Sequence, residues 1–251
     1  MMHGPAPTTD GAIIPPDMLL LAYRSGIFPM SDSREDTEVF WVEPEDRAII
    51  PLDEFTPARS LRKVVRQDRF RVTIDTAFRD VMAACAAPRP DHPESWISER
   101  IMLSYAALHE VGHAHSVECW VGNDLVGGLY GVAFDRVFCG ESMFSRTDNA
   151  SKVALVWLIA LLKHAGFRLL DCQFMTNHLA TLGAKAITQS DYVEMLGEAR
   201  AFATNPITAM RLPDAYVSLL CDVSSDGASA SSLSAASSPG KLIAQSFIHT
   251  S

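Results

Sequence analysis

The sequence predicts a mixed α/β protein, and three observations lead to this fold class. The chain has 251 residues, of which 48% are hydrophobic, which is enough for a sizeable core in one large or two small domains. The stretch from Ser116 to Cys139 is rich in strand signals, with tight turns at Gly122-Asn123 and Asp135-Arg136. A helical segment and another strand follow, and this order indicates a mixed sheet.

In the first half of the chain, prolines, glycines and small polar residues mark the ends of the elements. Pro15-Pro16-Asp17 opens a helix that Gly26 stops, and Ser98 caps a helix that runs to about Glu110. Apolar triplets on either side of a charged turn indicate two short strands. The elements expected here are helices over 18–25, 59–66, 78–85 (capped by Thr76) and 98–110, and strands over 40–42, 48–50 and 70–74.

The second half of the chain shows further strand and helix signals, followed by a stretch that lacks them. The central strands are expected over 116–120, 124–134 and 137–139, and Gly166 closes a helix over 151–164. A strand over 167–172 and helices over 178–182 and 191–201 follow. From Ser224 to Ser238 the chain is rich in Ser, Ala and Gly, which predicts a disordered tail.

Composition excludes several classes of protein. The net charge of −9 excludes a wholly basic nucleic-acid binder, although a local basic patch remains open. The five scattered cysteines indicate reduced thiols in a cytoplasmic protein. The first residues lack a signal-peptide pattern, and the longest apolar run, Val153 to Leu162, is too short to cross a bilayer. No membrane association is therefore expected.

Two short runs place polar residues in apolar surroundings, where burial costs free energy unless a partner or ligand compensates. Glu141 follows a strand and Gly140, and Asp171 and Gln173 share one face of a later strand. An Asp beside a Gln on one face can accept a hydrogen bond from the amide and orient it. The alternative is a pair of capping or strand-edge interactions, and the pattern by itself names no reaction.

A basic run stands out in this acidic chain. Six cations lie within thirteen residues, and only Asp68 offsets them. A solvated helix face and a phosphate-binding surface both fit this spacing. The six are Arg59, Arg62, Lys63, Arg66, Arg69 and Arg71.

His109-Glu110-Val111-Gly112-His113 matches the H-E-x-x-H pattern of zinc peptidases. Gly112 stops the helix between the two histidines, however, so we expect them to cap carbonyl groups. Trp41 and Trp96 lie beside loops and fit either a core or a surface that stacks on a nucleobase.

Longer stretches carry a resemblance that is more specific than any of these patterns. The chain resembles the leucyl/phenylalanyl-tRNA–protein transferase family in unbroken order over about residues 15 to 200. The matching stretches are Tyr23 to Met30, Arg47 to Leu52, Arg59 to Lys63, Ser95 to Ile97, Leu108 to His115, Leu125 to Gly131, Phe138 to Ser145 and Asp171 to Gln173.

This resemblance implies a fold, an activity and partners. The fold would be a small N-terminal α/β domain (15–65) after a flexible start (1–14), then an acetyltransferase-like (GNAT-like) domain (66–222) and the disordered tail (223–251). The activity would be transfer of Leu, Phe or Met from aminoacyl-tRNA to an N-terminal Arg or Lys, which marks the acceptor protein for degradation by the N-end rule pathway. The enzyme would be a cytoplasmic monomer without a metal or cofactor, since the chain lacks a convincing R/Q-x-x-G-x-G/A loop for acetyl-CoA.

The resemblance also assigns site residues. An apolar pocket for the donor side chain maps onto Leu129, Phe138, Met143, Leu155, Leu158 and Leu170. Trp96 matches the family tryptophan near the terminal adenosine, and the basic run would bind tRNA. Where the family often has Trp-Trp-Ser-Pro, this chain has Trp41-Val42-Glu43-Pro44, so only Trp41 can stack there.

The chemistry of such a transfer needs no metal or ATP, because the donor ester is already activated. An α-amine has a pKa of about 8, so a useful fraction of it is neutral at neutral pH. We therefore expect Gln173, oriented by Asp171, to hold the attacking amine, and Glu141 to bind the acceptor's positive charge or share that amine. A zinc peptidase built on His109 and His113, or a non-catalytic RNA-binding protein, are the alternatives.

Overall fold

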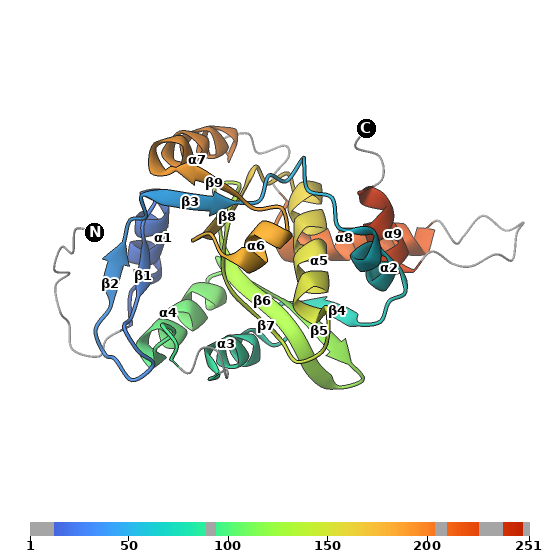
Figure 1. The fold of residues 1–251 in the computed structure, drawn as a ribbon, viewed down its shortest axis with the longest axis horizontal. Helices are drawn as coiled ribbons and strands as arrows, with labels where there is room; N and C mark the ends of the chain where they lie inside the picture. Colours follow the sequence, from blue (N-terminus) through green and yellow to red (C-terminus); the bar gives the residue numbers. More distant parts are fainter. Residues whose placement is uncertain (1–12, 89–93, 204–209, 226–237, 248–251) are drawn as a thin grey trace, which may run out of the picture.

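A computed structural model describes residues 13–88, 94–203, 210–225 and 238–247 (Figure 1). A seven-stranded sheet in the order β4-β5-β6-β7-β8-β3-β9 runs through the middle of this part of the chain. All neighbours pair antiparallel except β7 and β8, which are parallel. The predicted mixed α/β class is therefore confirmed.

The strands of this sheet are β3 (Asp46–Ile49), β4 (Arg71–Ile74), β5 (Ala114–Val121), β6 (Asp124–Phe134), β7 (Val137–Ser145), β8 (Leu169–Gln173) and β9 (Lys185–Thr188). A separate antiparallel pair consists of β1 (Phe28–Met30) and β2 (Phe40–Val42). The turns that join β5, β6 and β7 contain left-handed residues, with φ of 57° at Gly122, 41° at Asp135 and 70° at Arg136. These are the two turns that the sequence predicts, and such residues suit tight hairpins.

Helices cover both faces of the sheet and divide the core into two clusters. One face carries α2 (Arg59–Arg66), α5 (Ala150–His164), α8 (Leu212–Ser225) and α9 (Pro239–Ser246). The other face carries α1 (Pro16–Arg24), α3 (Phe78–Ala86), α4 (Glu99–Glu110) and α7 (Gln189–Ala203). The short α6 (Asn177–Thr181) follows β8. None of the helices in the described ranges is both long and apolar enough to cross a membrane.

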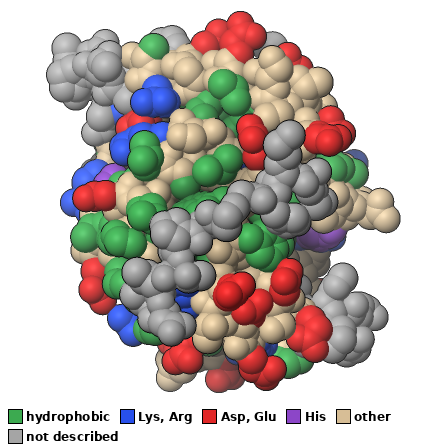
Figure 2. Space-filling model, turned by 90° about the vertical axis from the view of Figure 1, so that its left-hand side faces the viewer, with side chains coloured by type: hydrophobic (Ala, Val, Ile, Leu, Met, Phe, Trp, Pro, Cys, Tyr) green, Lys and Arg blue, Asp and Glu red, His purple; other side chains and the backbone are tan. Residues whose placement is uncertain are grey.

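The face formed by α1 and α4 leaves apolar side chains in solvent. Met18 and Leu21 of α1 and Leu103 of α4 are exposed. Figure 2 shows this left-hand side of the molecule, where hydrophobic side chains gather in the middle and Asp and Glu lie around them. The basic helix α2 lies at the opposite end of the molecule (Figure 1).

Local signals predicted most helices, with one error at a cap. Ser98 caps α4 as expected, since its hydroxyl accepts a hydrogen bond from the Ile101 amide at 3.4 Å. Thr76 does not cap α3: the residue at the N-cap is Ala77, and the Thr76 hydroxyl donates to the Ile74 carbonyl at 3.2 Å. The tight turn at Asp75, with φ of 55°, lies between strand and helix, and the helix itself begins at Phe78 as predicted.

The structure bears on both ends of the predicted domain division. Of residues 15–65, which were predicted as a small N-terminal domain, β3 lies inside the large sheet between β8 and β9, and α2 packs against α5 and α9. The predicted disordered tail over 223–251 is wrong for Pro239–Ser246, which form α9 because Ile243 and Phe247 enter the core at 3% exposure. Residues 1–12, 226–237 and 248–251 of the predicted flexible ends lie outside the described residues.

Candidate active site

The two polar runs lie where β7 and β8 part. The strands pair from Val137 and Leu169 as far as Cys139 and Asp171, and no pair is formed beyond this point. In β7, Gly140 pairs with Gly131 and Ser142 pairs with Tyr130 of β6, which leaves Glu141 as an extra residue. Such a β-bulge redirects a side chain, and it explains why Glu141 points away from the apolar side of its strand.

The end of β8 carries a matching irregularity. In the pairing with β3, Ala48 faces Gln173 and Ile49 faces Asp171, so Cys172 is the extra residue. Gln173 has a left-handed backbone, with φ of 62°, which is uncommon for a residue other than glycine. Both strands therefore leave regular pairing at the residues that the sequence singled out.

Glu141 and Gln173 are joined directly across the gap. The Gln173 side-chain amide donates to Glu141 Oε1 at 2.9 Å, and both residues are buried, with 6% and 9% exposure for Gln173 and Glu141. The Tyr23 hydroxyl donates to the same oxygen at 2.6 Å, and the Tyr105 hydroxyl donates to Oε2 at 3.3 Å. The two tyrosine hydroxyls also contact each other. Among the described residues, no hydrogen bond reaches Gln173 Oε1, which leaves that acceptor for a ligand.

Burial changes the protonation of this cluster. Loss of water around the Glu141 carboxyl raises its pKa from 4.5 to about 7, although hydrogen bonds from Tyr23, Gln173 and Tyr105 oppose the shift. Burial also raises the pKa of Tyr23 and Tyr105, so both stay protonated and donate. Glu141 is therefore a carboxyl group that titrates near neutral pH inside a shell of neutral donors.

Asp171 plays a different structural part from the predicted one. It does not accept from the Gln173 side chain; instead its Oδ1 accepts the Gln173 backbone amide at 2.8 Å. Arg47 donates to both carboxylate oxygens, at 3.1 Å and 2.7 Å, and the Tyr192 hydroxyl donates to Oδ2 at 3.1 Å. Asp171 is fully buried and has four donors, so it fixes the backbone of Gln173 while Glu141 fixes the side chain.

Arg47, the ion-pair partner of Asp171, is also buried and makes several contacts. Its guanidinium is fully buried, donates to the Gly26 carbonyl at 2.9 Å and lies 4.1 Å from the Tyr192 ring centre. The nearby Asp171 carboxylate keeps the pKa of Arg47 raised in spite of burial. This ion pair joins residues 124 positions apart.

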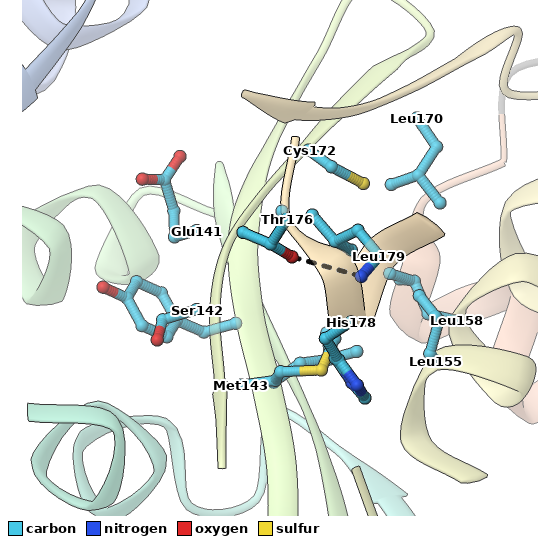
Figure 3. A pocket seen from close by; sticks show the side chains of 13 residues that line it. Glu141, Ser142, Met143, Leu155, Leu158, Leu170, Cys172, Thr176, His178 and Leu179 are labelled. Carbon is cyan, nitrogen blue, oxygen red and sulfur yellow. Dashed lines mark hydrogen bonds between the residues drawn. The ribbon is translucent and has the colours of Figure 1, made fainter. Parts of the chain in front are cut away.

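An apolar cavity lies next to this polar cluster, and Glu141 is one of the residues that line it. It has a volume of about 210 Å³, and five of the six predicted pocket residues line it: Leu129, Met143, Leu155, Leu158 and Leu170. Figure 3 shows that the Glu141 carboxylate points away from Leu155, Leu158 and Leu170. Cys172 of β8, Thr176 at the N-cap of α6 and His178 of α6 also border the cavity.

Three predicted pocket and stacking residues do not line the cavity. Phe138 is fully buried behind it, in contact with Gly131, where an added Cβ would lie 2.4 Å from the ring. Trp41 and Trp96 pack at the edge of the other core cluster and do not reach the cavity wall.

The basic run separates into two groups. Arg59, Arg62, Lys63 and Arg66 of α2 border a surface groove, whereas Arg69 and Arg71 do not. Arg71 instead lies over the Trp120 ring at 5.1 Å, on β4.

The histidine pattern adopts the arrangement expected for a helix end. Helix α4 ends at Glu110, so the two histidines do not share a helical face. The Nδ1 of His109 donates to the Ala114 carbonyl at 2.7 Å, and that of His113 to the Ala133 carbonyl at 3.0 Å. Glu110 pairs with Arg79 at the surface. In the described part of the chain no group of three His, Cys, Asp or Glu side chains is arranged to hold a metal.

Sequence reasoning missed the donors that surround the carboxylates, namely Tyr23, Arg47, Tyr105 and Tyr192. Arg47 carried the same signal as Glu141, because it is a charged residue beside the apolar triplet Ala48-Ile49-Ile50. The tyrosines carried no such signal, since an aromatic residue on a helix is usually part of the core.

Comparison with known proteins decides the family. The family model described as leucyl/phenylalanyl-tRNA protein transferase matches residues 49–197, and the model of its N-terminal domain matches residues 13–45. The chain belongs to the leucyl/phenylalanyl-tRNA–protein transferase family. The limit between the two models agrees with the start of the large sheet at β3.

Relatives of this family cover most of the chain. The leucyl/phenylalanyl-tRNA–protein transferase of Novosphingobium aromaticivorans is 55% identical over 255 residues, 95% of this chain and 97% of that protein. The transferase of the same name from Zymomonas mobilis is 57% identical over 187 residues, 74% of this chain and 70% of that protein. A solved structure of L-PGS from Bacillus licheniformis is 12% identical, with a TM-score of 0.34 over 75% of this chain and 71% of that one. As a member of the leucyl/phenylalanyl-tRNA–protein transferase family, the chain is an aminoacyltransferase with aminoacyl-tRNA and a protein as substrates.

Proposed function

We propose that this chain transfers Leu, Phe or Met from tRNA to the N-terminal amine of proteins that begin with Arg or Lys. The observation that carries the proposal is the gap between β7 and β8. An apolar cavity opens at this gap, and Glu141, which is hydrogen-bonded to Gln173, is one of its lining residues. An aminoacyl ester held in this gap would place its side chain in the cavity and its carbonyl carbon near the polar pair.

The cavity wall supports an apolar donor side chain. The leucines of β6, α5 and β8 enclose an apolar space of about 210 Å³ that suits unbranched or γ-branched side chains, and Met143 adds an adaptable wall. Apolar pockets separate close analogues by only about 1–3 kcal/mol per methylene. Mixed use of Leu, Phe and Met is the expected result.

The polar pair supports attack by a neutral amine. Gln173 Oε1 accepts an N–H of the amine, while Glu141 holds the amide from the other side and keeps this oxygen in place. The amine nitrogen forms a bond with the ester carbon, the bond to the ribose oxygen breaks, and the proton of the amine ends on that oxygen. Positioning of this kind supplies much of an enzyme's acceleration when the donor is already activated.

The positive charge of the acceptor suits the surroundings of Glu141. Above a pH of about 7 the Glu141 carboxylate is ionised and attracts the cationic side chain of the N-terminal residue, or accepts a hydrogen bond from the attacking amine. The cations of α2 would hold the phosphate backbone of the donor tRNA, and Trp96, with Trp41, would stack on its terminal nucleotides. We place the reaction in the cytoplasm, where charged tRNA is found, and propose that a single chain suffices.

The direct test is transfer of labelled Leu from charged tRNA to a protein with N-terminal Arg. The matched control is the same protein with an acetylated N-terminus, which has no free amine. Labelling of the first protein alone is the expected result. Equal labelling of both, or of neither, would refute the proposed reaction.

A further inference from the structure

A groove of about 810 Å³ lies on the surface between α2 and the C-terminal helix α9. One wall is the cationic face of α2, and the other is formed by Ala244 and Gln245 of α9. The two helices lie side by side at the right of Figure 1. None of the groove's four cations has an ion pair or side-chain hydrogen bond within the described ranges; they are Arg59, Arg62, Lys63 and Arg66.

The spacing of these cations fits a chain of phosphates. Positions i, i+3, i+4 and i+7 share one face of a helix, over a length of about 10 Å. A row of unpaired cations at this density matches the closely spaced charges of a nucleic-acid backbone.

Helix α9 is docked on α2 by a contact that only glycine allows. The Gly240 amide donates to Asp68 Oδ1 at 2.8 Å. A Cβ at Gly240 would lie 2.1 Å from the Val65 carbonyl oxygen. At the other end of α9, Phe247 packs edge-on against Phe55 with ring centres 5.6 Å apart.

The walls of the groove carry a strong excess of positive charge. Asp68 is the one acidic residue between Arg59 and Arg71, and its carboxylate is engaged by the Gly240 amide. Helix α9 has no acidic residue and has one lysine, Lys241. In a chain of net charge −9, both walls of this groove are therefore free of negative charge apart from the engaged Asp68.

A depression of about 510 Å³ extends from the groove, with which it shares Ser60, towards α6. It is lined by Ser60 and Leu61 of α2 and by Ala180 and Thr181 of α6. Leu179 of the same α6 lines the cavity. A tRNA whose charged end enters the cavity can thus extend over this depression to α2.

We propose that α9 is the second wall of the tRNA-binding groove, so that the C-terminal helix sets the affinity for the tRNA body. This inference rests on the proposed function and adds a surface that the sequence assigned to a disordered tail. The occupant is the phosphate backbone of the tRNA, away from its charged end.

The test changes the charge of the α9 wall without changing its docking. Gln245 is exposed and lines the groove, so Gln245→Glu should weaken tRNA binding by about threefold and Gln245→Lys should strengthen it by a similar factor. Ser246→Glu is the matched control, because it adds the same charge at an exposed α9 position outside the groove and should have a smaller effect. The measurement is the dissociation constant for charged tRNA between 50 and 200 mM salt. Equal constants for the two Gln245 variants would overturn the inference.

A second variant removes the α9 wall while leaving the four cations of α2 in place. Gly240→Val should undock α9 and weaken tRNA binding, whereas the slope of log affinity against log salt should change by less than one contact, or about 0.7–0.9, because the α2 cations remain. Transfer from charged tRNA should fall relative to transfer from leucyl-adenosine, a donor without the tRNA body. An unchanged ratio would contradict the role of α9, whereas absence of transfer from both donors in the wild-type protein would refute the proposed function itself.

Discussion

Replacing Glu141 by glutamine should remove a pH dependence from the stability of the fold. The carboxyl is buried among Tyr23, Tyr105 and Gln173, and its pKa is raised from 4.5 to about 7 by loss of water. Glutamine keeps an oxygen that can accept from Tyr23 and Gln173, but it cannot ionise. The variant therefore isolates the cost of the buried charge.

The size and sign of the effect follow from linkage between protonation and folding. Between pH 4.5 and 7 the folded protein holds a proton that the unfolded chain has released, so the free energy of unfolding falls as pH rises. A shift of this size corresponds to about 3 kcal/mol. The contribution of protonated Glu141 is fully present below pH 4.5 and is lost as pH rises through about 7.

The assay is urea unfolding of the wild-type protein and the Glu141→Gln variant between pH 5 and pH 8. The variant should gain stability relative to the wild type by about 2–3 kcal/mol across this window. Glu110→Gln, at a side chain that is 68% exposed, is the control and should show no such trend. A difference that stays flat, or that changes in the opposite direction, would refute the assignment of Glu141 as the neutral-range group.

Four further changes have defined outcomes. Arg47→Met should lower the free energy of unfolding by about 3–5 kcal/mol, because it leaves the Asp171 charge buried and unpaired, and a urea midpoint like the wild type would contradict this. Tyr192→Phe removes one of the four donors to the Asp171 carboxylate and should lower the free energy of unfolding by only about 1 kcal/mol in that assay. A loss as large as that of Arg47→Met would show that the remaining three donors do not hold this carboxylate. Leu158→Ala widens the cavity and should raise kcat/KM for Phe over Leu by about tenfold, whereas an unchanged ratio would place the donor side chain elsewhere. Dialysis against a chelator should leave transfer intact, and loss of activity restored by zinc would support the peptidase alternative.

Local sequence signals predicted the elements whose ends are set by neighbouring residues. Helix α2 begins and ends where expected, and the turns at Gly122 and Asp135 have the left-handed backbones that their residue types favour. β9 escaped prediction because its residues are mostly exposed at the sheet edge and lack an apolar pattern. α9 escaped because Ile243 and Phe247 become core residues only through contact with distant elements.

The sequence predicted which residues form the polar site, but not which of them are hydrogen-bonded to one another. Glu141 and Gln173 were singled out as buried polar residues, and the helix between their strands brings them together. The pairing of Asp171 with Arg47 depends on β3 entering the sheet beside β8, which no local pattern encodes. The sequence therefore led to Asp171 as the residue that orients the Gln173 amide, whereas the hydrogen bonds assign that part to Glu141.

The central claim is that Gln173 holds the attacking amine at the gap between β7 and β8. It is tested most directly by single-turnover transfer of Leu from charged tRNA to an N-terminal Arg acceptor with the Gln173→Ala variant, together with the dissociation constant for the charged tRNA. We expect a transfer rate about 100-fold lower, since loss of positioning costs this much, and a dissociation constant within about twofold of the wild type. A wild-type rate, or a loss explained entirely by weaker tRNA binding, would contradict it.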